Sequence, residues 1–264
     1  MINKKYLTTI VIFVLLLLIM SYVLYTRSFV NKPLFDEIFL INLKRRPDRL
    51  INFIDFYKKS DMKNFAVTKF DAIDGSQLDV DKVPLSELAK AELKQLESTG
   101  YRTKHYQLTK GAIGCYLSHV KIWETILNRD NDVALIFEDD AKVPEDINML
   151  IKNEMEHIPK NWDIVLFGYL CTKCFKHEKY NEVERFMLTH CYIIKKSAIS
   201  KIFNSNTLFP ITQQIDALMS ELSSLINIYT VKDKLVKQFG SRTDIQAPLK
   251  NKKSKNVHDR VKVL

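Results

Sequence analysis

Short apolar runs that end at polar or acidic residues alternate along this chain with longer segments whose apolar residues recur at helical spacing. The apolar runs, each typical of a buried strand, are residues 37–43, 65–70, 133–137 and 163–167. The helical segments are residues 46–59, 84–97 and 109–129. This alternation predicts an α/β fold with a mainly parallel central sheet, in which ligands bind beyond the carboxyl ends of the strands.

One stretch lies outside this alternation, because residues 6–26 contain no charged residue and are dominated by apolar side chains. About 20 such residues form a helix that spans the roughly 30 Å hydrocarbon core of a membrane. A cleavable signal peptide with Lys4 and Lys5 as its positive region is the alternative, but its apolar stretch is usually about 7–15 residues long and ends at small residues. The sequence therefore favours an uncleaved transmembrane signal anchor.

The flanking charges do not fix the orientation of this anchor, because Lys4 and Lys5 precede it and Arg27 and Lys32 follow it, two basic residues on each side. We expect a single-pass type II arrangement, with a short cytoplasmic tail and the body in an ER-like or Golgi-like lumen. The predicted division of the chain is a tail at 1–5, an anchor at 6–26, a stem at 27–36, a catalytic domain at 37–247 and a basic tail at 248–264.

The formal net charge of +9 is concentrated near the ends of the chain. Residues 248–264 contain six basic residues and one acidic residue, and Lys4 and Lys5 add further positive charge. The body is therefore nearly neutral and shows no stripe of basic and aromatic residues, which argues against nucleic acid as a partner. A hydrophobic content of 46% excludes disorder as the main state.

Three consecutive carboxylates, Glu138, Asp139 and Asp140, follow the strand predicted at 133–137. Close like charges raise one another's pKa and resist ionisation unless a positive group neutralises them. Oxygen ligands of this kind suit Mg²⁺ or Mn²⁺, which can bridge the phosphates of a nucleotide diphosphate. The alternative is an acidic loop that caps the helix expected at 144–156.

The cysteines leave two interpretations open. Cys171 and Cys174, together with His177, His190 and Cys191, contain donors that could hold Zn²⁺, although they form only half of a zinc motif. In an oxidising lumen, a disulfide that involves Cys171, Cys174 or Cys191 is favoured. The remaining cysteine, Cys115, is expected to pack in a helix face.

Four motifs occur in an order and spacing that resemble glycosyltransferase family 25, which includes lipooligosaccharide and procollagen galactosyltransferases. The motifs are INLKRRPDR at 41–49, FDAIDG at 70–75, LTKGAIGCYLSH at 108–119 with Trp123, and ALIFEDD at 134–140. Weaker similarity continues at 162–168, 190–194 and Asp216, so that the resemblance covers roughly residues 37–245.

The resemblance implies a GT-A-like nucleotide-sugar-binding fold and an inverting transfer assisted by Mn²⁺ (or Mg²⁺). The hexose, most often galactose, would pass from a UDP-sugar donor to a hydroxyl on a glycan or protein acceptor. The residues expected to bind the donor are Asn42, Arg46, Arg49, Asp74, Gly75, Ser118, His119 and Glu138.

Asp139, Asp140 and His190 are the expected metal ligands, and Asp140 is the strongest candidate among the acids. Asp216 is the expected base on the acceptor side, because an inverting displacement needs a group that takes the hydroxyl proton and is not a metal ligand.

Simpler roles remain as alternatives for several of these residues. They are solvated helix charges at Arg46 and Arg49, a plain turn at Asp74 and Gly75, a buried hydrogen-bonded imidazole at His119, and a helix cap at Asp216.

One position departs from the family, which usually has glutamate where this chain has Ala112. Two hypotheses therefore remain. The chain is either a membrane-anchored glycosyltransferase or a catalytically inactive, membrane-tethered protein of the same fold that binds a sugar or a partner.

Overall fold

The computed structural model describes residues 12–22, 33–104, 106–240 and 243–248, which belong to two compact units, one that ends at Leu34 and one that begins at Phe35. Residues 12–22 of the first unit are helical. Among the described residues, no helix combines the length and the apolar character needed to cross a membrane. Parts of the predicted anchor, stem and basic tail, and all of the tail at 1–5, lie outside the described residues.

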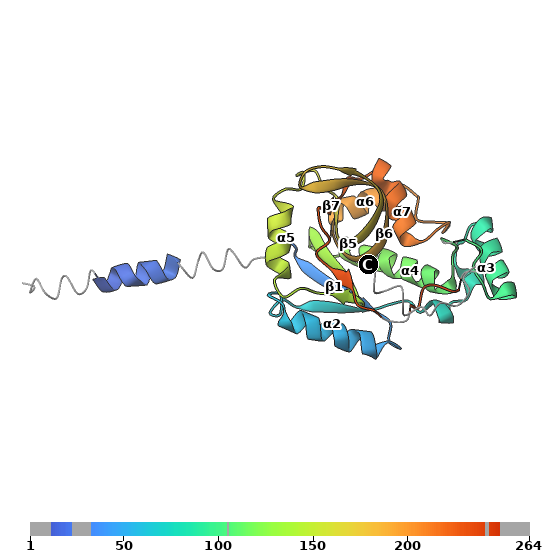
Figure 1. Ribbon diagram of the computed structural model, residues 1–264, viewed down its shortest axis with the longest axis horizontal. Coiled ribbons are helices and arrows are strands. Elements are labelled where there is room, and N and C mark those ends of the chain that lie inside the picture. Colours follow the sequence, from blue (N-terminus) through green and yellow to red (C-terminus); the bar gives the residue numbers. More distant parts are fainter. Residues whose placement is uncertain (1–11, 23–32, 105, 241–242, 249–264) are drawn as a thin grey trace, which may run out of the picture. The chain divides into compact units, whose positions relative to one another are not determined.

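The second unit is built on a six-stranded sheet with strand order β2-β1-β3-β6-β5-β7 (Figure 1). Its strands are β1 (Glu37–Asn42), β2 (Val67–Asp71), β3 (Val133–Glu138), β5 (Ile164–Lys176), β6 (Tyr180–Lys195) and β7 (Ile228–Val231). The pairings make β6 the single strand that runs against the other five. The predicted α/β fold with a mainly parallel sheet is therefore confirmed.

Helices and short elements connect these strands. The helices are α2 (Pro47–Lys59), α3 (Glu87–Thr99), α4 (Lys110–Leu127), α5 (Ile147–Met155), α6 (Lys196–Asn204) and α7 (Ile215–Glu221), and the 3₁₀ turns are η1 (Gly75–Gln77), η2 (Val80–Lys82) and η3 (Leu222–Ser224). Strands β4 (Ala141–Lys142) and β8 (Lys237–Gln238) form a separate two-stranded sheet. Helix α3 begins later than predicted, because the Ser86 side chain caps it by accepting a hydrogen bond from Ala89 N.

The alternation of side chains along the strands places α2 and α4 on opposite faces of the sheet. Phe137 of β3 packs against Phe53 of α2, with ring centroids 5.4 Å apart. The residue before it in β3 lies opposite Tyr192 of β6, whose hydroxyl accepts a 3.0 Å hydrogen bond from Trp123 Nε1 of α4. In Figure 1, α2 runs along one side of the strands, and α6 and α7 lie on the other side.

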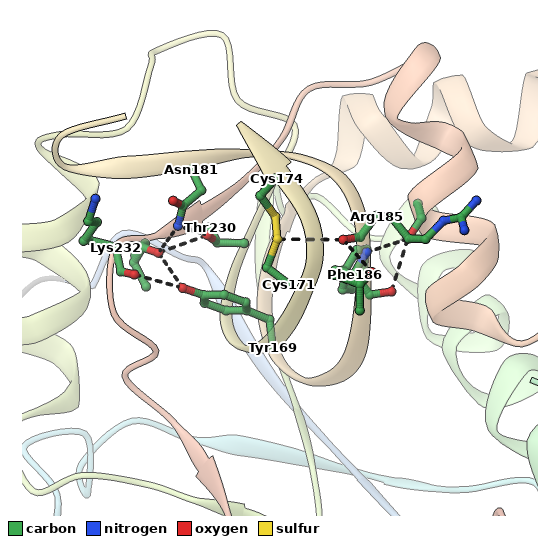
Figure 2. The surroundings of a disulfide bond; sticks show 11 residues. Tyr169, Cys171, Cys174, Asn181, Arg185, Phe186, Thr230 and Lys232 are labelled. Atoms are coloured by element: carbon green, nitrogen blue, oxygen red, sulfur yellow. Dashed lines mark hydrogen bonds between the residues drawn. A yellow bond between two sulfur atoms is a disulfide. The ribbon is translucent and has the colours of Figure 1, made fainter. Parts of the chain in front are cut away.

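The β5–β6 hairpin curls so that β7 pairs with the start of β5 along one edge and with the start of β6 along the other. Figure 2 shows the disulfide between Cys171 and Cys174 within β5, where Cys171 Sγ lies 3.8 Å from the carbonyl oxygen of Arg185. The predicted disulfide is confirmed for this pair. Cys191 is a buried free thiol of β6 that pairs with Phe137 of β3, so its side chain lies on the same face of the sheet as Phe137. The alternative zinc site is wrong, since two of its thiols are bonded to each other.

The start of α4 is enclosed by backbone from two distant segments. A Cβ atom on Gly114 would overlap the backbone at Ile73 and Gly75, and one on Gly111 would overlap the carbonyl of Asp244. These contacts require glycine because only a residue without a side chain permits such an approach. The first turn of α4 is thereby fixed between the loop after β2 and the described C-terminal segment at 243–248.

Candidate active site

A cleft of about 340 Å³ opens beyond the carboxyl end of β3, where the fold predicts ligand binding. Its volume lies within the range of small-molecule sites. Polar and titratable side chains dominate one part of its lining, which includes Arg49, Ala112, Cys115, Glu138, Asp140, Thr189, His190, Asp216, Gln238 and Asp244. Of the predicted site residues, the cleft thus brings together Arg49, Glu138, Asp140, His190 and Asp216.

Glu138 is the last residue of β3, and its side chain points to the α4 side of the sheet. Its Oε1 accepts a 2.6 Å hydrogen bond from Thr189 Oγ1 and lies 3.4 Å from His119 Nε2. Burial raises the pKa of Glu138, but the contacts with His119 and Thr189 outweigh it, and the net pKa lies below its ordinary value. The carboxylate is therefore ionised and held in one orientation.

Asp139 faces the opposite side of the sheet. Its Oδ1 accepts a 3.0 Å hydrogen bond from Arg49 Nη1, and its Oδ2 accepts a 2.8 Å hydrogen bond from Asn42 Nδ2. Burial raises the pKa of Asp139, and Arg49 offsets that rise only in part. The structure thus bonds a predicted metal ligand to two predicted donor-binding residues, and this triad joins β1, α2 and the end of β3.

Asp140 lies just past the strand and has one oxygen that lacks a partner. Its Oδ2 accepts a 3.1 Å hydrogen bond from Gln238 Nε2, while its Oδ1 is buried without a hydrogen-bond partner among the described residues. Burial and the nearby charge of Glu138 raise the pKa of Asp140 to about 7. An unpartnered buried carboxylate oxygen at this pKa favours either a proton or a cation.

His190 of β6 presents a complementary atom in the same cleft. Its Nε2 lies 3.0 Å from the carbonyl oxygen of Val236, which can only accept, so Nε2 carries the proton. The other ring nitrogen, Nδ1, is buried and has no hydrogen-bond partner among the described residues. Burial lowers the pKa of His190, so the imidazole is neutral and Nδ1 has a free lone pair. Asp140 Oδ1 and His190 Nδ1 are both donor types that bind divalent cations, and both residues line the same cleft.

Asp216 is the second residue of α7 and lies in the same cleft. Its Oδ1 accepts a hydrogen bond from Ala217 N at 2.8 Å, and its Oδ2 accepts one from Leu188 N at 3.2 Å. Leu188 has φ = +72°, a left-handed conformation that costs a branched residue energy and is held here by Asp216. Burial, with a contribution from Glu138, raises the pKa of Asp216.

An ion-pair cluster borders the cleft at the start of α2. Arg46 pairs with Asp48 at 2.7 Å and with Asp244, while Arg45 pairs with Asp74 at 2.6 Å and also with Asp244. Burial raises the pKa of Asp244, but the two arginines outweigh it and hold the pKa below its ordinary value. Sequence reasoning missed Arg45 and Asp244, because no local pattern marks a pair that is separated by nearly the whole domain.

The remaining predicted donor residues have structural partners. The Asp74 side chain caps η1 by accepting a 2.9 Å hydrogen bond from Ser76 N, and Gly75 provides the close contact with α4. Ser118 is fully buried, donates to Gly114 O at 2.7 Å and accepts from Ile73 N at 2.9 Å. Ser118 and Gly75 also line a small pocket of about 60 Å³ beside the cleft.

His119 is fully buried on α4, and its Nδ1 lies 2.9 Å from the Tyr192 hydroxyl. Its Nε2 faces Glu138 at the border of the cleft. The sequence carried no signal for the Tyr192 contact, because the strand that holds this residue was not predicted.

A mainly parallel sheet with acids and arginines at its carboxyl edge is the arrangement of an α/β protein that binds a charged small molecule. The sequence profile of glycosyltransferase family 25 (LPS biosynthesis protein) matches residues 35–239. The chain therefore belongs to glycosyltransferase family 25, and the resemblance found from its motifs is confirmed.

Curated relatives include both galactosyltransferases and inactive proteins. Procollagen galactosyltransferase 2 of Mus musculus is 32% identical over 143 residues, which cover 52% of this chain and 21% of the relative. The inactive glycosyltransferase 25 family member 3 of Homo sapiens is 32% identical over 155 residues, which cover 57% of this chain and 24% of the relative. The matched region is thus less than a quarter of each relative.

Among solved structures, the apo form of UDP-glucose pyrophosphorylase aligns with a TM-score of 0.40 at 8% identity. The alignment covers 77% of this chain and 91% of that one. A similarity of this size carries no argument about the present chain.

Proposed function

We propose that this protein is a glycosyltransferase that moves a hexose, with galactose as the first candidate, from a UDP-sugar to a hydroxyl on a glycan or protein acceptor. The observation that carries the proposal is the pair of buried, unpartnered atoms, Asp140 Oδ1 and His190 Nδ1, in a cleft that Arg49 and Asp216 also line. Membership in family 25 and its similarity to procollagen galactosyltransferases support the same chemistry.

Asp140 and His190 would hold Mn²⁺ or Mg²⁺ through these two atoms. Asp139 would join them only if it released Arg49 or Asn42, since both of its oxygens are engaged. When bound, the cation supplies Lewis-acid stabilisation of the charge that grows on the departing diphosphate. Arg46 and Arg49 border the same region and would pair with phosphate oxygens.

Asp216 is the proposed base. In an inverting displacement, the acceptor oxygen attacks the anomeric carbon of the donor, the bond to the diphosphate breaks, and the hydroxyl proton passes to the base. A carboxylate with a raised pKa is suited to take that proton, and Asp216 meets this requirement. The backbone N–H groups of Leu188 and Ala217 hold its oxygens in place.

We also propose that residues 6–26 anchor the protein in a membrane, with the domain on the lumenal side. The absence of charge from this stretch supports the anchor. The disulfide between Cys171 and Cys174 supports an oxidising compartment for the domain.

A second candidate is a sugar-binding or partner-binding protein without transferase activity. It is favoured by Ala112, which lines the cleft where the family usually has glutamate, and by the inactive proteins among the relatives. Such a protein would bind the nucleotide without turning it over.

The deciding experiment measures UDP binding and UDP release by the full chain in detergent, with Mn²⁺ and a panel of UDP-sugars. An enzyme releases UDP from at least one UDP-hexose, and both Asp140→Asn and Asp216→Asn abolish this release. Asp140→Asn also loses metal-dependent UDP binding, whereas Asp216→Asn retains it. Binding without turnover of any donor supports the second candidate, and a folded protein that binds no UDP refutes the transferase.

A further inference from the structure

A second group of donor atoms lies beside the cleft, on the α4 side of the sheet. One ligand atom each from Cys115, His119 and Glu138 lies within 4.8 Å of the other two. Cys115 and His119 are four residues apart on α4, so their side chains lie on the same face of the helix. Glu138 reaches the same point because alternation along β3 turns its side chain toward α4.

His119 Nε2 gives the independent sign that this group is built to hold something. The side chain is fully buried, and its Nε2 has no hydrogen-bond partner among the described residues. It faces Glu138 Oε1 at 3.4 Å, an electrostatic contact that is longer than an ordinary hydrogen bond and leaves room for an ion to take its place between the two atoms. A buried polar atom without a partner is costly unless a bound group satisfies it.

The surroundings of these ligands resemble the outer shell of a metal site. The other ring nitrogen of His119, Nδ1, lies 2.9 Å from the Tyr192 hydroxyl, whose oxygen accepts a 3.0 Å hydrogen bond from Trp123 Nε1. An ion at Nε2 requires the ring proton on Nδ1, from which it donates to the Tyr192 oxygen. Thr189 orients the Glu138 carboxylate at 2.6 Å. Metal-binding histidines and carboxylates are typically fixed by such partners, which set the ring nitrogen that faces the ion.

We infer that Cys115, His119 and Glu138 form a binding site for a soft divalent cation of the Zn²⁺ class, separate from the oxygen-rich position at Asp140. A thiolate, a neutral imidazole and a carboxylate supply two negative charges, which balance the ion, and the thiol proton is released to water on binding. Cys115 and Glu138 line the cleft, so the ion has a path of entry and an open fourth position. Sulfur and nitrogen ligands select against Mn²⁺ and Mg²⁺.

The inference goes beyond the proposed transfer reaction and has a consequence for it. Glu138 is one of the residues expected to bind the donor, and an ion held by Glu138 withdraws its carboxylate. Zinc is therefore expected to oppose the binding of a UDP-sugar, while Mn²⁺ at Asp140 supports it.

The test uses Co²⁺ as a spectroscopic substitute for Zn²⁺, with the full chain in detergent and without reductant, so that the Cys171–Cys174 disulfide stays closed. One equivalent of Co²⁺ is expected to produce the near-ultraviolet sulfur-to-cobalt charge-transfer band and the visible bands of a tetrahedral ion, and one equivalent of Zn²⁺ should remove them. Cys115→Ala should lose the charge-transfer band. The matched control is Cys191→Ala, which removes the other free thiol. Cys191 pairs with Phe137 and therefore lies on the α2 side of the sheet, away from α4, so this variant should keep the band.

Asp140→Asn distinguishes this site from the proposed catalytic metal. It should keep the charge-transfer band even where it abolishes Mn²⁺-dependent UDP binding. No band in the folded protein, a band that persists in Cys115→Ala, or a band that disappears in Asp140→Asn would overturn the inference. Should Cys115→Ala not fold, X-ray absorption on the zinc-loaded native protein decides instead: one sulfur ligand supports the site, and none refutes it.

Discussion

Replacing Asp140 with asparagine is expected to stabilise the metal-free protein while removing its response to Mn²⁺. The pKa of Asp140 is raised from 3.8 to about 7 by burial and by Glu138. Folding therefore penalises the ionised form, and a difference of this size corresponds to a ceiling of about 4 kcal/mol above neutral pH. The actual gain should be smaller than this ceiling, because Glu138 and Asp140 affect each other's ionisation and the Asp140 side chain retains 15% exposure to solvent. We therefore expect Asp140→Asn to raise the free energy of unfolding by about 2 kcal/mol.

The pH dependence follows from the direction of this shift. Well below the unfolded pKa of 3.8, Asp140 is protonated in both the folded and the unfolded state, so native protein and variant should have similar stability. As the pH rises from about 4 to about 7, the unfolded chain releases its proton first and the native protein loses stability relative to Asp140→Asn. Above about pH 7 the difference is constant, and the variant should melt about 5 °C higher.

The assay is urea or thermal unfolding at about pH 5 and about pH 8, with and without Mn²⁺. Mn²⁺ should raise the Tm of the native protein, more at the higher pH because protons compete for the same carboxylate, and should leave the variant unchanged. Asp48→Asn is the matched control: Arg46 holds the pKa of Asp48 at about 2, so this exposed carboxylate stabilises the fold and its removal should act in the opposite direction. Destabilisation by Asp140→Asn at the higher pH would refute the reasoning.

Three further changes test the framework around the site. Arg49→Met should destabilise the domain by about 3–5 kcal/mol in urea unfolding, because Asp139 stays buried with its Asn42 hydrogen bond but without its ion-pair partner. A second change, Asp139→Asn, should recover part of the loss, and no recovery would contradict the pairing. Gly114→Ala should lower the free energy of unfolding by about 1–3 kcal/mol, because the added Cβ would overlap the backbone at Ile73. A melting curve equal to that of the native protein would disprove this expectation. The double variant Cys171→Ser/Cys174→Ser should lose about 2 kcal/mol or less, since the loop is short, and a larger loss would show that the bridge does more than restrict the unfolded chain.

Much of the fold follows from local patterns in the sequence. The apolar runs at 37–43 and 133–137 and the periodic segment at 109–129 correspond to β1, β3 and α4 within two residues at either end. In contrast, β6 and β7 were not predicted, and β5 extends well past the apolar run at 163–167. The outer parts of β5 and β6 are partly exposed and are held by a curled hairpin, so tertiary pairing, rather than a buried apolar pattern, specifies them.

Local sequence patterns likewise located some residues of the candidate site and missed those that depend on contacts between distant segments. Glu138, Asp140 and Arg49 could be located because they follow predicted strands or begin a predicted helix. Asp244 could not, because its role depends on contacts with arginines at the start of α2, and no periodicity marks an ion pair across the domain. The expected packing of Cys115 in a helix face is confirmed, since it packs against the core from α4, but its place in the lining of the cleft was not predicted.

The three acids at the carboxyl end of β3 lie in three different environments and do not form one cluster. The sequence suggests that neighbouring carboxylates need a shared cation, but alternation along the strand sends Glu138 toward α4 and Asp139 toward α2, while Asp140 lies beyond the last pair. Each then meets a different partner, and the pKa falls for Glu138, rises for Asp139 and reaches about 7 for Asp140. Because Arg49 and Asn42 already compensate Asp139, Asp140 is the acid at which we propose a cation, since one of its buried oxygens has no hydrogen-bond partner among the described residues. Strand geometry therefore gives Asp139 a structural role, through its bonds with Asn42 and Arg49, and leaves Asp140 as the acid with an oxygen available to an ion.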